Sequence, residues 1–162
     1  MLIACEKIPI FDKINEKLFV GDVVAAQNRE LLKDNDVKCI ICLTDEKYKR
    51  FDDFEYHDFH IEDNRNVDIS SLFEKTNRIL DENIKNRNGK IFVHCQNGVS
   101  RSVTIVLAYL IYTGLCLKTA LEIVKKNRNT YSRPNSGFAK QLLKYERELL
   151  GTNSITFTEL HS

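Results

Sequence analysis

The stretch that decides the fold of this chain runs from residue 90 to residue 113 and reads KIFVHCQNGVSRSVTIVLAYLIYT. Residues 90–93 predict a buried strand, and residues 102–113, apolar on nearly every side, predict a buried helix. Between them Cys95 precedes Arg101 by six positions, with Gly98 in the loop. A strand, a short loop and a helix N-terminus form an anion cradle, because the first N–H groups of a helix have no intrahelical partner. A cysteine at the start of such a loop can act as a thiolate nucleophile toward a phosphoryl group.

The specificity of this pattern comes from its additional residues. A cysteine six positions before an arginine occurs by chance somewhere in about one chain in ten of this length. Requiring His94, Gly98 and Ser102 as well lowers that frequency to roughly one in ten thousand or less. The other four cysteines are followed at the same spacing by other residue types, namely Phe11, Asp45, Tyr48 and Glu122.

The rest of the chain predicts one α/β domain with a central, mostly parallel sheet of about five strands flanked by helices. The signature phosphate loop lies between a strand and a buried helix. Asp68, or a capping box from Ser71 to Glu74, would begin the first long helix, and Gly151 would end the last one. We expect a lead-in over 1–8, a catalytic domain over 9–150 and a loosely held tail over 151–162. The expected strands are 18–20, 37–43, 56–61 and 90–94, and the expected helices are 69–84, 102–113, 118–127 and 136–150.

Composition restricts the partners and the setting. The chain has 162 residues, enough for one domain with a proper core, and a net charge of +1. Near-neutral charge gives no bulk attraction to nucleic acid or to a membrane surface. The N-terminus lacks the long apolar stretch of a signal peptide, and the longest apolar run, residues 105–112, is too short to span a bilayer. Five cysteines without a secretion signal indicate a reducing setting, the cytoplasm or the nucleus.

Cys39 and Cys42 have the C-x-x-C spacing of a redox or zinc site. Their neighbours are apolar and predict a buried strand, on which positions three apart point to opposite faces. We therefore interpret them as two core cysteines. The alternative is that Cys42 forms a protective disulfide with Cys95 under oxidation. We expect no catalytic metal site and no cofactor, since no His, Cys and carboxylate cluster has ligand spacing.

The segment HCQNGVSRS resembles the signature loop of the cysteine-dependent protein phosphatases, in particular the dual-specificity branch. The resemblance extends over roughly residues 9–150. Residues 17–21 resemble the first strand of that fold. Residues 61–64 and 68–73 resemble its general-acid loop and the next helix. Residues 133–138, with Gln141 and Leu142, resemble the start of its last helix.

Within this motif Cys95 is the expected nucleophile, because a helix N-terminus and Arg101 favour its thiolate. Arg101 would hold two equatorial phosphate oxygens with its planar fork, which lysine could not do. The resemblance implies that His94 orients the loop, and Ser102 would hydrogen-bond the sulfur as it leaves. The remaining loop residues would bind phosphate mainly through backbone N–H groups, with Gly98 adopting a positive φ: Gln96, Asn97, Gly98, Val99 and Ser100.

The candidate general acid is Asp63, which sits on a polar loop at a separation from Cys95 that resembles the dual-specificity pattern. Asp-Asn pairs are also common turn formers, and Glu62 and Asp68 are competitors. Arg128 and Arg133 either lie on the rim and contact a second phosphate or an acidic segment, or are solvated surface charges. We expect Asn135 and Phe138 to lock the last helix against the body.

By resemblance, the chain is expected to hydrolyse phosphotyrosine and phosphoserine or phosphothreonine in a phosphorylated protein. It is too short to carry the aromatic loop of the larger tyrosine-specific phosphatases, and its uncharged loop argues against phosphoinositides. The enzymatic alternative is an RNA 5′-triphosphatase, whose relatives tend to lack an aspartate at the Asp63 position. A third alternative is a phosphate-binding module without activity, but the presence of both Cys95 and Arg101 argues against it. A fourth is a sulfur-transfer enzyme, which Asp63 and Ser102 disfavour. The sequence holds no signal for the oligomeric state.

Overall fold

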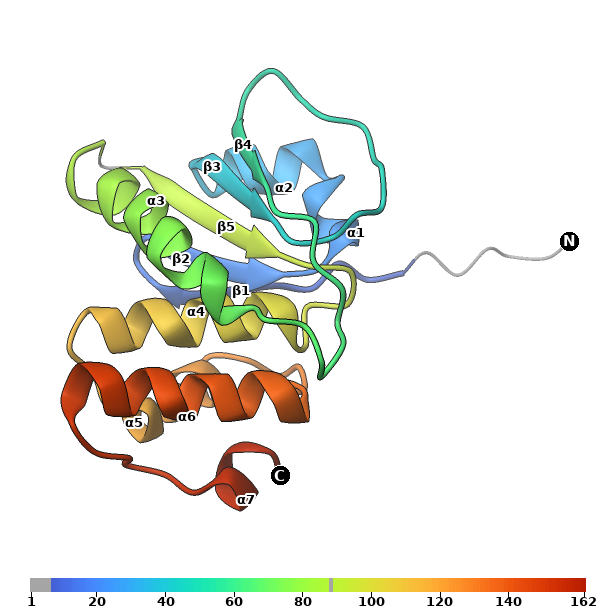
Figure 1. The fold of residues 1–162 in the computed structure, drawn as a ribbon. Helices are drawn as coiled ribbons and strands as arrows, with labels where there is room; N and C mark the ends of the chain where they lie inside the picture. The colour runs from blue at the N-terminus through green and yellow to red at the C-terminus, as the bar shows by residue number, and fades with distance from the viewer. Residues whose placement is uncertain (1–6, 88) are drawn as a thin grey trace, which may run out of the picture.

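The computed structural model describes residues 7–87 and 89–162, which build one five-stranded sheet in the order β1-β2-β5-β3-β4 (Figure 1). Strand β1 is antiparallel to β2, whereas β2, β5, β3 and β4 run parallel to one another. This confirms the expected mostly parallel sheet. The strand that leads into the signature loop, β5, lies at its centre. The strands are β1 (Phe11–Asn15), β2 (Leu18–Gly21), β3 (Val37–Cys42), β4 (Glu55–Asp58) and β5 (Lys90–His94).

Alternate residues of the three central strands face two separate cores, because side chains alternate across a sheet. The larger core contains Leu18, Val20, Ile91 and Val93. The smaller core, on the other face, contains the residues between them, such as Phe19 and Phe92. Central parallel strands must be apolar on both faces, and the sequence of β5 meets that requirement.

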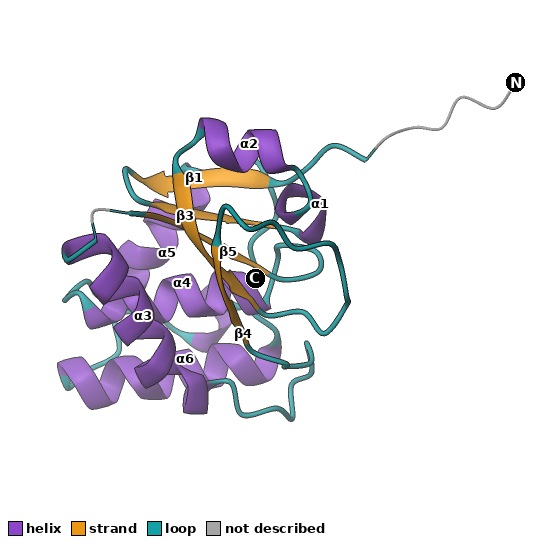
Figure 2. Ribbon diagram, turned by 90° about the horizontal axis from the view of Figure 1, so that it is seen from above, coloured by secondary structure: helices purple, strands orange, loops and turns teal. Residues whose placement is uncertain are grey.

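The helices cover both faces of the sheet (Figure 2). Helix α4, which follows the signature loop, lies between the sheet and α5 and α6 (Figure 1), and each of its residues from Arg101 to Ile111 is buried. The helices are α1 (Val23–Ala26), α2 (Arg29–Asp34), α3 (Phe73–Lys85), α4 (Arg101–Tyr112), α5 (Leu117–Lys126), α6 (Ser136–Leu150) and α7 (Phe157–Leu160). A 3₁₀ turn, Ser70–Leu72, precedes α3.

Several sequence-based boundaries differ from the structure. Strand β4 begins and ends earlier than expected. The Phe59 N–H still bonds to the Cys42 carbonyl on β3 (2.8 Å), and the chain then leaves the sheet, so that the Ile61 carbonyl accepts from Arg101 at the end of the signature loop. Strand β1 and helices α1 and α2 were not predicted. All three elements are short, and β1 is an edge strand in which only Ile14 is buried. Their apolar residues therefore show no clear helical or strand periodicity. Helix α6 ends as expected, with Gly151 in the left-handed region at φ 80°.

The expectation of a loose C-terminal tail is wrong. Ile155 and Leu160 are buried in the larger core, and α7 packs against α6. The buried carboxylate of Glu146 on α6 accepts hydrogen bonds from the backbone N–H of Ser154 (3.0 Å), from the Ser154 hydroxyl (2.5 Å) and from the Leu117 N–H (2.6 Å). Burial raises the pKa of Glu146, but these hydrogen bonds outweigh it and leave the pKa below its ordinary value. The sequence hides this arrangement because the segment contains three apolar residues without a helical or strand spacing, of which Ile155 and Leu160 are buried.

Replacing Glu146 by alanine is expected to lower the free energy of unfolding by about 3 kcal/mol, because the substitution leaves buried N–H groups without an acceptor. Urea unfolding followed by circular dichroism measures the change. Glu148→Ala is the matched control on the same helix, since the Glu148 side chain is exposed and lies 3.9 Å from Lys144. We expect less than about 0.5 kcal/mol for the control. Equal losses in the two variants would contradict the role given to Glu146.

Among residues 7–87 and 89–162, no helix is long and apolar enough to cross a membrane.

Candidate active site

The predicted nucleophile lies where β5 ends and the signature loop begins. The Cys95 side chain is buried, with 2% of the residue exposed. Its Sγ lies 3.2 Å from the Ser102 hydroxyl and accepts a hydrogen bond of 3.3 Å from the Gly98 N–H. Either atom of the Cys95–Ser102 pair can be the donor; when Cys95 is a thiolate, the hydroxyl and the Gly98 N–H both donate to the sulfur, as expected for a group that attacks and later leaves.

Gly98 allows the loop to close tightly over the end of β2. Its φ is 70°, in the left-handed region, and a Cβ there would lie 2.9 Å from the carbonyl of Gly21. The expected positive φ is confirmed. The loop is held against β2 by a bond from the Cys95 N–H to the Gly21 carbonyl (3.4 Å) and by one from the Val23 N–H to the Gln96 carbonyl (3.3 Å). Any side chain at position 98 would push the loop off this support.

Arg101 is fixed by two backbone carbonyls from distant parts of the chain. Its Nη1 donates to the carbonyl of Leu43 (3.2 Å) and to that of Ile61 (2.9 Å). Its Nε is buried and has no hydrogen-bond partner within the described residues. A buried donor without a partner is uncommon, and here it leaves a guanidinium donor for an anion.

Asp63 is joined to the signature loop through one residue, Asn135. The exposed Asp63 carboxylate accepts a hydrogen bond of 2.9 Å from the Asn135 side chain. The backbone N–H of Asn135 donates to the Ser100 hydroxyl (2.9 Å), and its side-chain oxygen caps α6 by accepting from the Phe138 N–H (2.8 Å). The prediction that Asn135 and Phe138 lock the last helix is confirmed. The same residue also holds the acid candidate beside the phosphate loop.

The path of the acid loop depends on Gly137. A Cβ at position 137 would overlap the carbonyl oxygen of Arg65, so the first turn of α6 packs directly against the backbone that follows Asp63. The competing carboxylates are placed differently. Asp68 accepts from the Ser70 hydroxyl (2.6 Å) and the Ser71 N–H (3.3 Å) and so caps the 3₁₀ turn. Glu62 is exposed to solvent.

His94 is buried beneath the loop and fixed in one tautomer. Its Nε2 lies 2.8 Å from the Tyr48 hydroxyl, and its Nδ1 lies 3.2 Å from the Cys95 carbonyl. The Cys95 carbonyl can only accept, so Nδ1 carries the ring proton and donates to it. Nε2 of the neutral ring then accepts a hydrogen bond from the Tyr48 hydroxyl. This supports an orienting role for His94 rather than a proton-transfer role.

Arg50 holds Tyr48 in position. Its guanidinium carbon lies over the rings of Tyr48 and Tyr56, at 4.4 and 4.6 Å from their centroids. Asp58 at the end of β4 pairs with it at 2.7 Å. The loop between β3 and β4 thereby supports the histidine that precedes Cys95.

Burial lowers the pKa of His94 to about 4, and this gives a prediction for acid stability. In the unfolded chain the pKa is about 6.5, so between these values the unfolded state binds more protons than the folded state. The contribution of the neutral His94 ring to the free energy of unfolding is therefore complete above about pH 7. It declines by about 3 kcal/mol as the pH falls from 6.5 toward 4. We expect the NMR signals of the His94 ring to stay constant from about pH 5.5 to pH 8. A ring that titrates near pH 6.5 would contradict the buried neutral state.

The rim interpretation of Arg128 is wrong. Arg128 is buried, forms an ion pair of 2.8 Å with Asp12 on β1, and donates to the Ser132 hydroxyl at 3.0 Å. It ties the loop before α6 to the sheet edge. Arg133 does lie beside the signature loop, since its backbone N–H donates to the Val99 carbonyl (3.0 Å).

The half-buried guanidinium of Arg133 is engaged within the chain. It donates to the Tyr131 hydroxyl at 2.9 Å, and its other terminal nitrogen lies 2.8 Å from His161 after α7. Its Nε is buried and has no partner among the described residues, whereas both terminal nitrogens are engaged, so a contact with a second phosphate stays a prediction.

The remaining cysteines have other surroundings. Cys39 and Cys42 are buried and free, and Cys95 and Cys116 are also free thiols. Burial raises the pKa of Cys39 to about 12 and also raises that of Cys42, which disfavours the thiolates needed for disulfide exchange. The described part of the chain contains no group of three or more His, Cys, Asp or Glu side chains placed to hold a metal ion.

Comparisons with known proteins agree with this geometry. The family described as dual specificity phosphatase, catalytic domain, matches residues 18–148. Dual specificity protein phosphatase 1 of Homo sapiens is 38% identical over 135 residues, which cover 82% of this chain and 36% of the human protein. Dual specificity protein phosphatase 1B of Arabidopsis thaliana is 33% identical, over 86% of this chain and 83% of the plant protein. The chain thus spans little more than a third of the human relative.

Solved structures show the same architecture. The crystal structure of human DUSP28 superimposes with a TM-score of 0.82 at 28% identity, covering 90% of this chain and 99% of that one. A mouse putative dual specificity phosphatase complexed with zinc tungstate gives a TM-score of 0.83 at 27% identity, over 93% and 95% of the two chains. On the strength of the matched domain and of these identities, this chain belongs to the dual specificity phosphatase family of the protein tyrosine phosphatase superfamily.

Proposed function

We propose that this chain is a protein phosphatase that hydrolyses phosphotyrosine and phosphoserine or phosphothreonine through a phosphocysteine intermediate. The observation that carries the proposal is the convergence of Ser102 and Gly98 on the Cys95 sulfur at the start of a buried helix. The free Nε donor of Arg101, on the first residue of the same helix, supports it. The substrate is a phosphorylated protein, and the proposal includes no cofactor.

In the first step, Cys95 Sγ attacks phosphorus and the bond from phosphorus to the substrate oxygen breaks. Asp63 gives its proton to that leaving oxygen. Arg101 and the backbone N–H groups of the loop stabilise the charge on the equatorial oxygens. In the second step, Asp63 takes a proton from water, the water oxygen bonds to phosphorus, and the sulfur leaves with a hydrogen bond from Ser102. The products are inorganic phosphate and the free enzyme.

The setting we propose is the cytoplasm or the nucleus, because a thiol nucleophile needs a reducing environment. An RNA 5′-triphosphatase remains the enzymatic alternative. Relatives with that activity tend to lack an aspartate at the Asp63 position, whereas this chain has Asp63, hydrogen-bonded to Asn135. The net charge of +1 also argues against RNA, because it gives no attraction to a polyanion.

The test is hydrolysis of p-nitrophenyl phosphate from about pH 5 to pH 8 with a chelator present, for the native chain and Asp63→Asn. We expect the substitution to lower kcat by about 10²-fold and to remove the fall of the rate on the alkaline side, since that fall reports loss of the acid's proton. Asp68→Asn is the matched control and should retain the native rate and profile.

An Asp63→Asn variant with native kcat would contradict the acid assignment. A native chain that is inactive on this substrate and on phosphopeptides, yet releases phosphate from triphosphate-ended RNA, would replace the proposal by the alternative.

A further inference from the structure

Three contacts attach the acid loop to helix α6. Asn135, the N-cap of α6, donates from its Nδ2 to Oδ1 of Asp63 (2.9 Å). Two residues further on, the first turn of α6 at Gly137 packs directly against the backbone of Arg65. The segment that contains the acid candidate therefore lies against a helix at two successive points.

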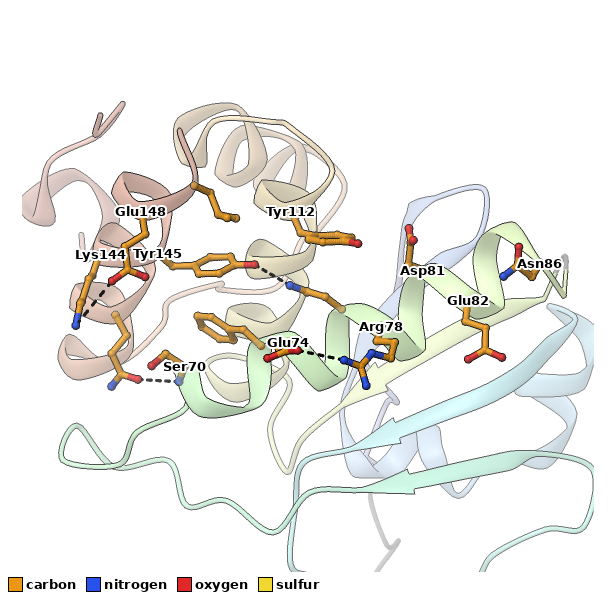
Figure 3. A pocket seen from close by; sticks show the side chains of 14 residues that line it. Ser70, Glu74, Arg78, Asp81, Glu82, Asn86, Tyr112, Lys144, Tyr145 and Glu148 are labelled. Atoms are coloured by element: carbon orange, nitrogen blue, oxygen red, sulfur yellow. Dashed lines mark hydrogen bonds and ion pairs between the residues drawn. The ribbon is translucent and has the colours of Figure 1, made fainter. Parts of the chain in front are cut away.

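The third contact lies where the acid loop joins the turn before α3. Nε2 of Gln141 on α6 donates to the Val67 carbonyl (2.9 Å), and Oε1 of the same side chain accepts from the Ser70 N–H (2.9 Å). Ser70 and Gln141 both line the groove between α3 and α6, and their bond is drawn beside Ser70 in Figure 3. One helix therefore fixes the chain from Asp63 to Ser70.

The N-terminus of α6 is itself attached to the signature loop. The backbone N–H of Asn135 donates to the Ser100 hydroxyl (2.9 Å), and the backbone N–H of Arg133 donates to the Val99 carbonyl (3.0 Å). Asn135 therefore binds the phosphate loop through its backbone and the acid loop through its side chain.

The orientation of the Asn135 amide follows from its partners. The Phe138 N–H can only donate, so the atom 2.8 Å from it is the oxygen of the Asn135 side chain. The amide nitrogen then points to Asp63, and an N–H group can only donate. Oδ1 of Asp63 therefore accepts, whereas its Oδ2 has no hydrogen-bond partner within residues 7–87 and 89–162.

This geometry distinguishes the two oxygens of Asp63. A proton on Oδ1 would have to share that oxygen with the Asn135 N–H, whereas Oδ2 is unoccupied. The neutral carboxyl group therefore carries its proton on Oδ2. Asp63 is exposed to solvent, so this second oxygen is open to an incoming substrate.

We propose that Asn135 is the positioning residue of the general acid, an inference that rests on the proposed phosphatase function. It keeps the proton of Asp63 on Oδ2 and holds that oxygen beside the signature loop. As the Oδ2–H bond breaks and the proton bonds to the leaving oxygen, Asp63 becomes a carboxylate. A hydrogen bond to a carboxylate is stronger than one to a neutral carboxyl group, so Asn135 stabilises the transition state more than the ground state. In the second step Oδ2 takes a proton from water.

The test separates this donor from the helix cap. Asn135→Ser keeps an oxygen that can cap α6, but its side chain is too short to reach Asp63. Asn28→Ser is the matched control, because Asn28 caps α2 in the same way, with its side chain accepting from the Leu31 N–H (3.1 Å). We expect the two variants to have similar melting temperatures, since each replaces one good capping residue by another.

The readout is kcat/KM for two substrates with different leaving groups. Phenolate is a more basic leaving group than p-nitrophenolate, so hydrolysis of phenyl phosphate depends more on the acid. We expect Asn135→Ser to lower kcat/KM about tenfold for phenyl phosphate and about twofold for p-nitrophenyl phosphate, and Asn28→Ser to lower neither. Equal losses on the two substrates, or native values on both, would overturn the proposal.

A double-mutant cycle shows whether Asn135 acts through Asp63. In the Asp63→Asn background, the Asn135→Ser substitution should cause no further loss of kcat/KM on phenyl phosphate, because no acid is left to position. A further loss of about tenfold would mean that Asn135 acts through the signature loop alone, and the positioning role would be wrong.

The hydrogen bond can also be observed without turnover. In the ¹⁵N-labelled full chain, the NMR signals of the Asn135 side-chain amide should shift as Asp63 ionises, and this shift should be absent from Asp63→Asn. Constant signals in the native chain would overturn the assignment of the contact. If the native chain hydrolyses neither substrate, the proposed function fails and the positioning role fails with it. If the native chain is active and Asn135→Ser is equally active on phenyl phosphate, the proposed function stands and only the present inference fails.

Discussion

Replacing Cys95 by serine is expected to lower turnover of p-nitrophenyl phosphate by at least about 10⁴-fold. Serine can occupy the same position, but its hydroxyl keeps its proton, because Asp63 acts as the acid in this step and is not available as a base. The Ser102 hydroxyl and the Gly98 N–H can stabilise an anionic sulfur, whereas a hydrogen bond to a neutral hydroxyl does not make that hydroxyl a nucleophile. Burst kinetics on the native chain, absent from the variant, would show the phosphocysteine directly.

Two measurements separate lost chemistry from a lost fold. Cys116→Ser, at a half-buried thiol outside the signature loop, should keep the native rate. The Cys95→Ser variant should still bind a phosphotyrosine peptide in calorimetry, because Arg101 and the loop N–H groups are unchanged. Residual turnover within about tenfold of the native rate would mean that another group is the nucleophile.

Replacing Arg101 by lysine is expected to lower kcat/KM by at least about 10³-fold while preserving the charge. The ammonium group is a point charge and cannot present two donors in one plane to the transferring phosphoryl group. The substitution also removes the planar group that bonds to the carbonyls of Leu43 and Ile61, so the cation loses its fixed direction.

Inorganic phosphate provides the control for this second variant. The native chain should gain thermal stability as phosphate is added, because the ligand binds the folded state alone, and Arg101→Lys should gain much less. Similar stabilisation of both chains, together with a kcat/KM within tenfold of native, would show that the planar fork is dispensable.

The sequence was sufficient for the part of the site that is local in the chain. Cys95, Gly98 and Ser102 meet through a loop and the first turn of a helix, so their spacing determined their contact. The partners of Arg101 could not be predicted. They are backbone carbonyls 40 and 58 residues away. Every residue has a backbone carbonyl, so the residue type does not show which one will accept a hydrogen bond. Tyr48 was missed for a related reason, since it lies in a loop without periodicity and contacts His94, 46 residues later in the chain.

The wrong interpretations share a dependence on distant partners. Arg128 has the residue type of a rim cation, but it is buried and forms an ion pair with Asp12, 116 residues earlier in the chain. The C-terminal segment was predicted to be loosely held because its sequence does not show that Ile155 and Leu160 become buried against distant parts of the chain. Local sequence patterns do not contain such information, because the burial of a residue depends on which distant segments pack against it.

The central place of β5 has a consequence for how the protein folds. Ile91 pairs in parallel with Leu18 on one side and with Cys39 on the other, so long loops must close before the middle of the sheet exists. Until then the two halves of the sheet, β1-β2 and β3-β4, have no strand between them. A chain still being synthesised, or one that has refolded only in part, therefore lacks the support on which the Cys95 loop is built. We expect the proposed activity to recover only in the last phase of refolding, when the core is complete.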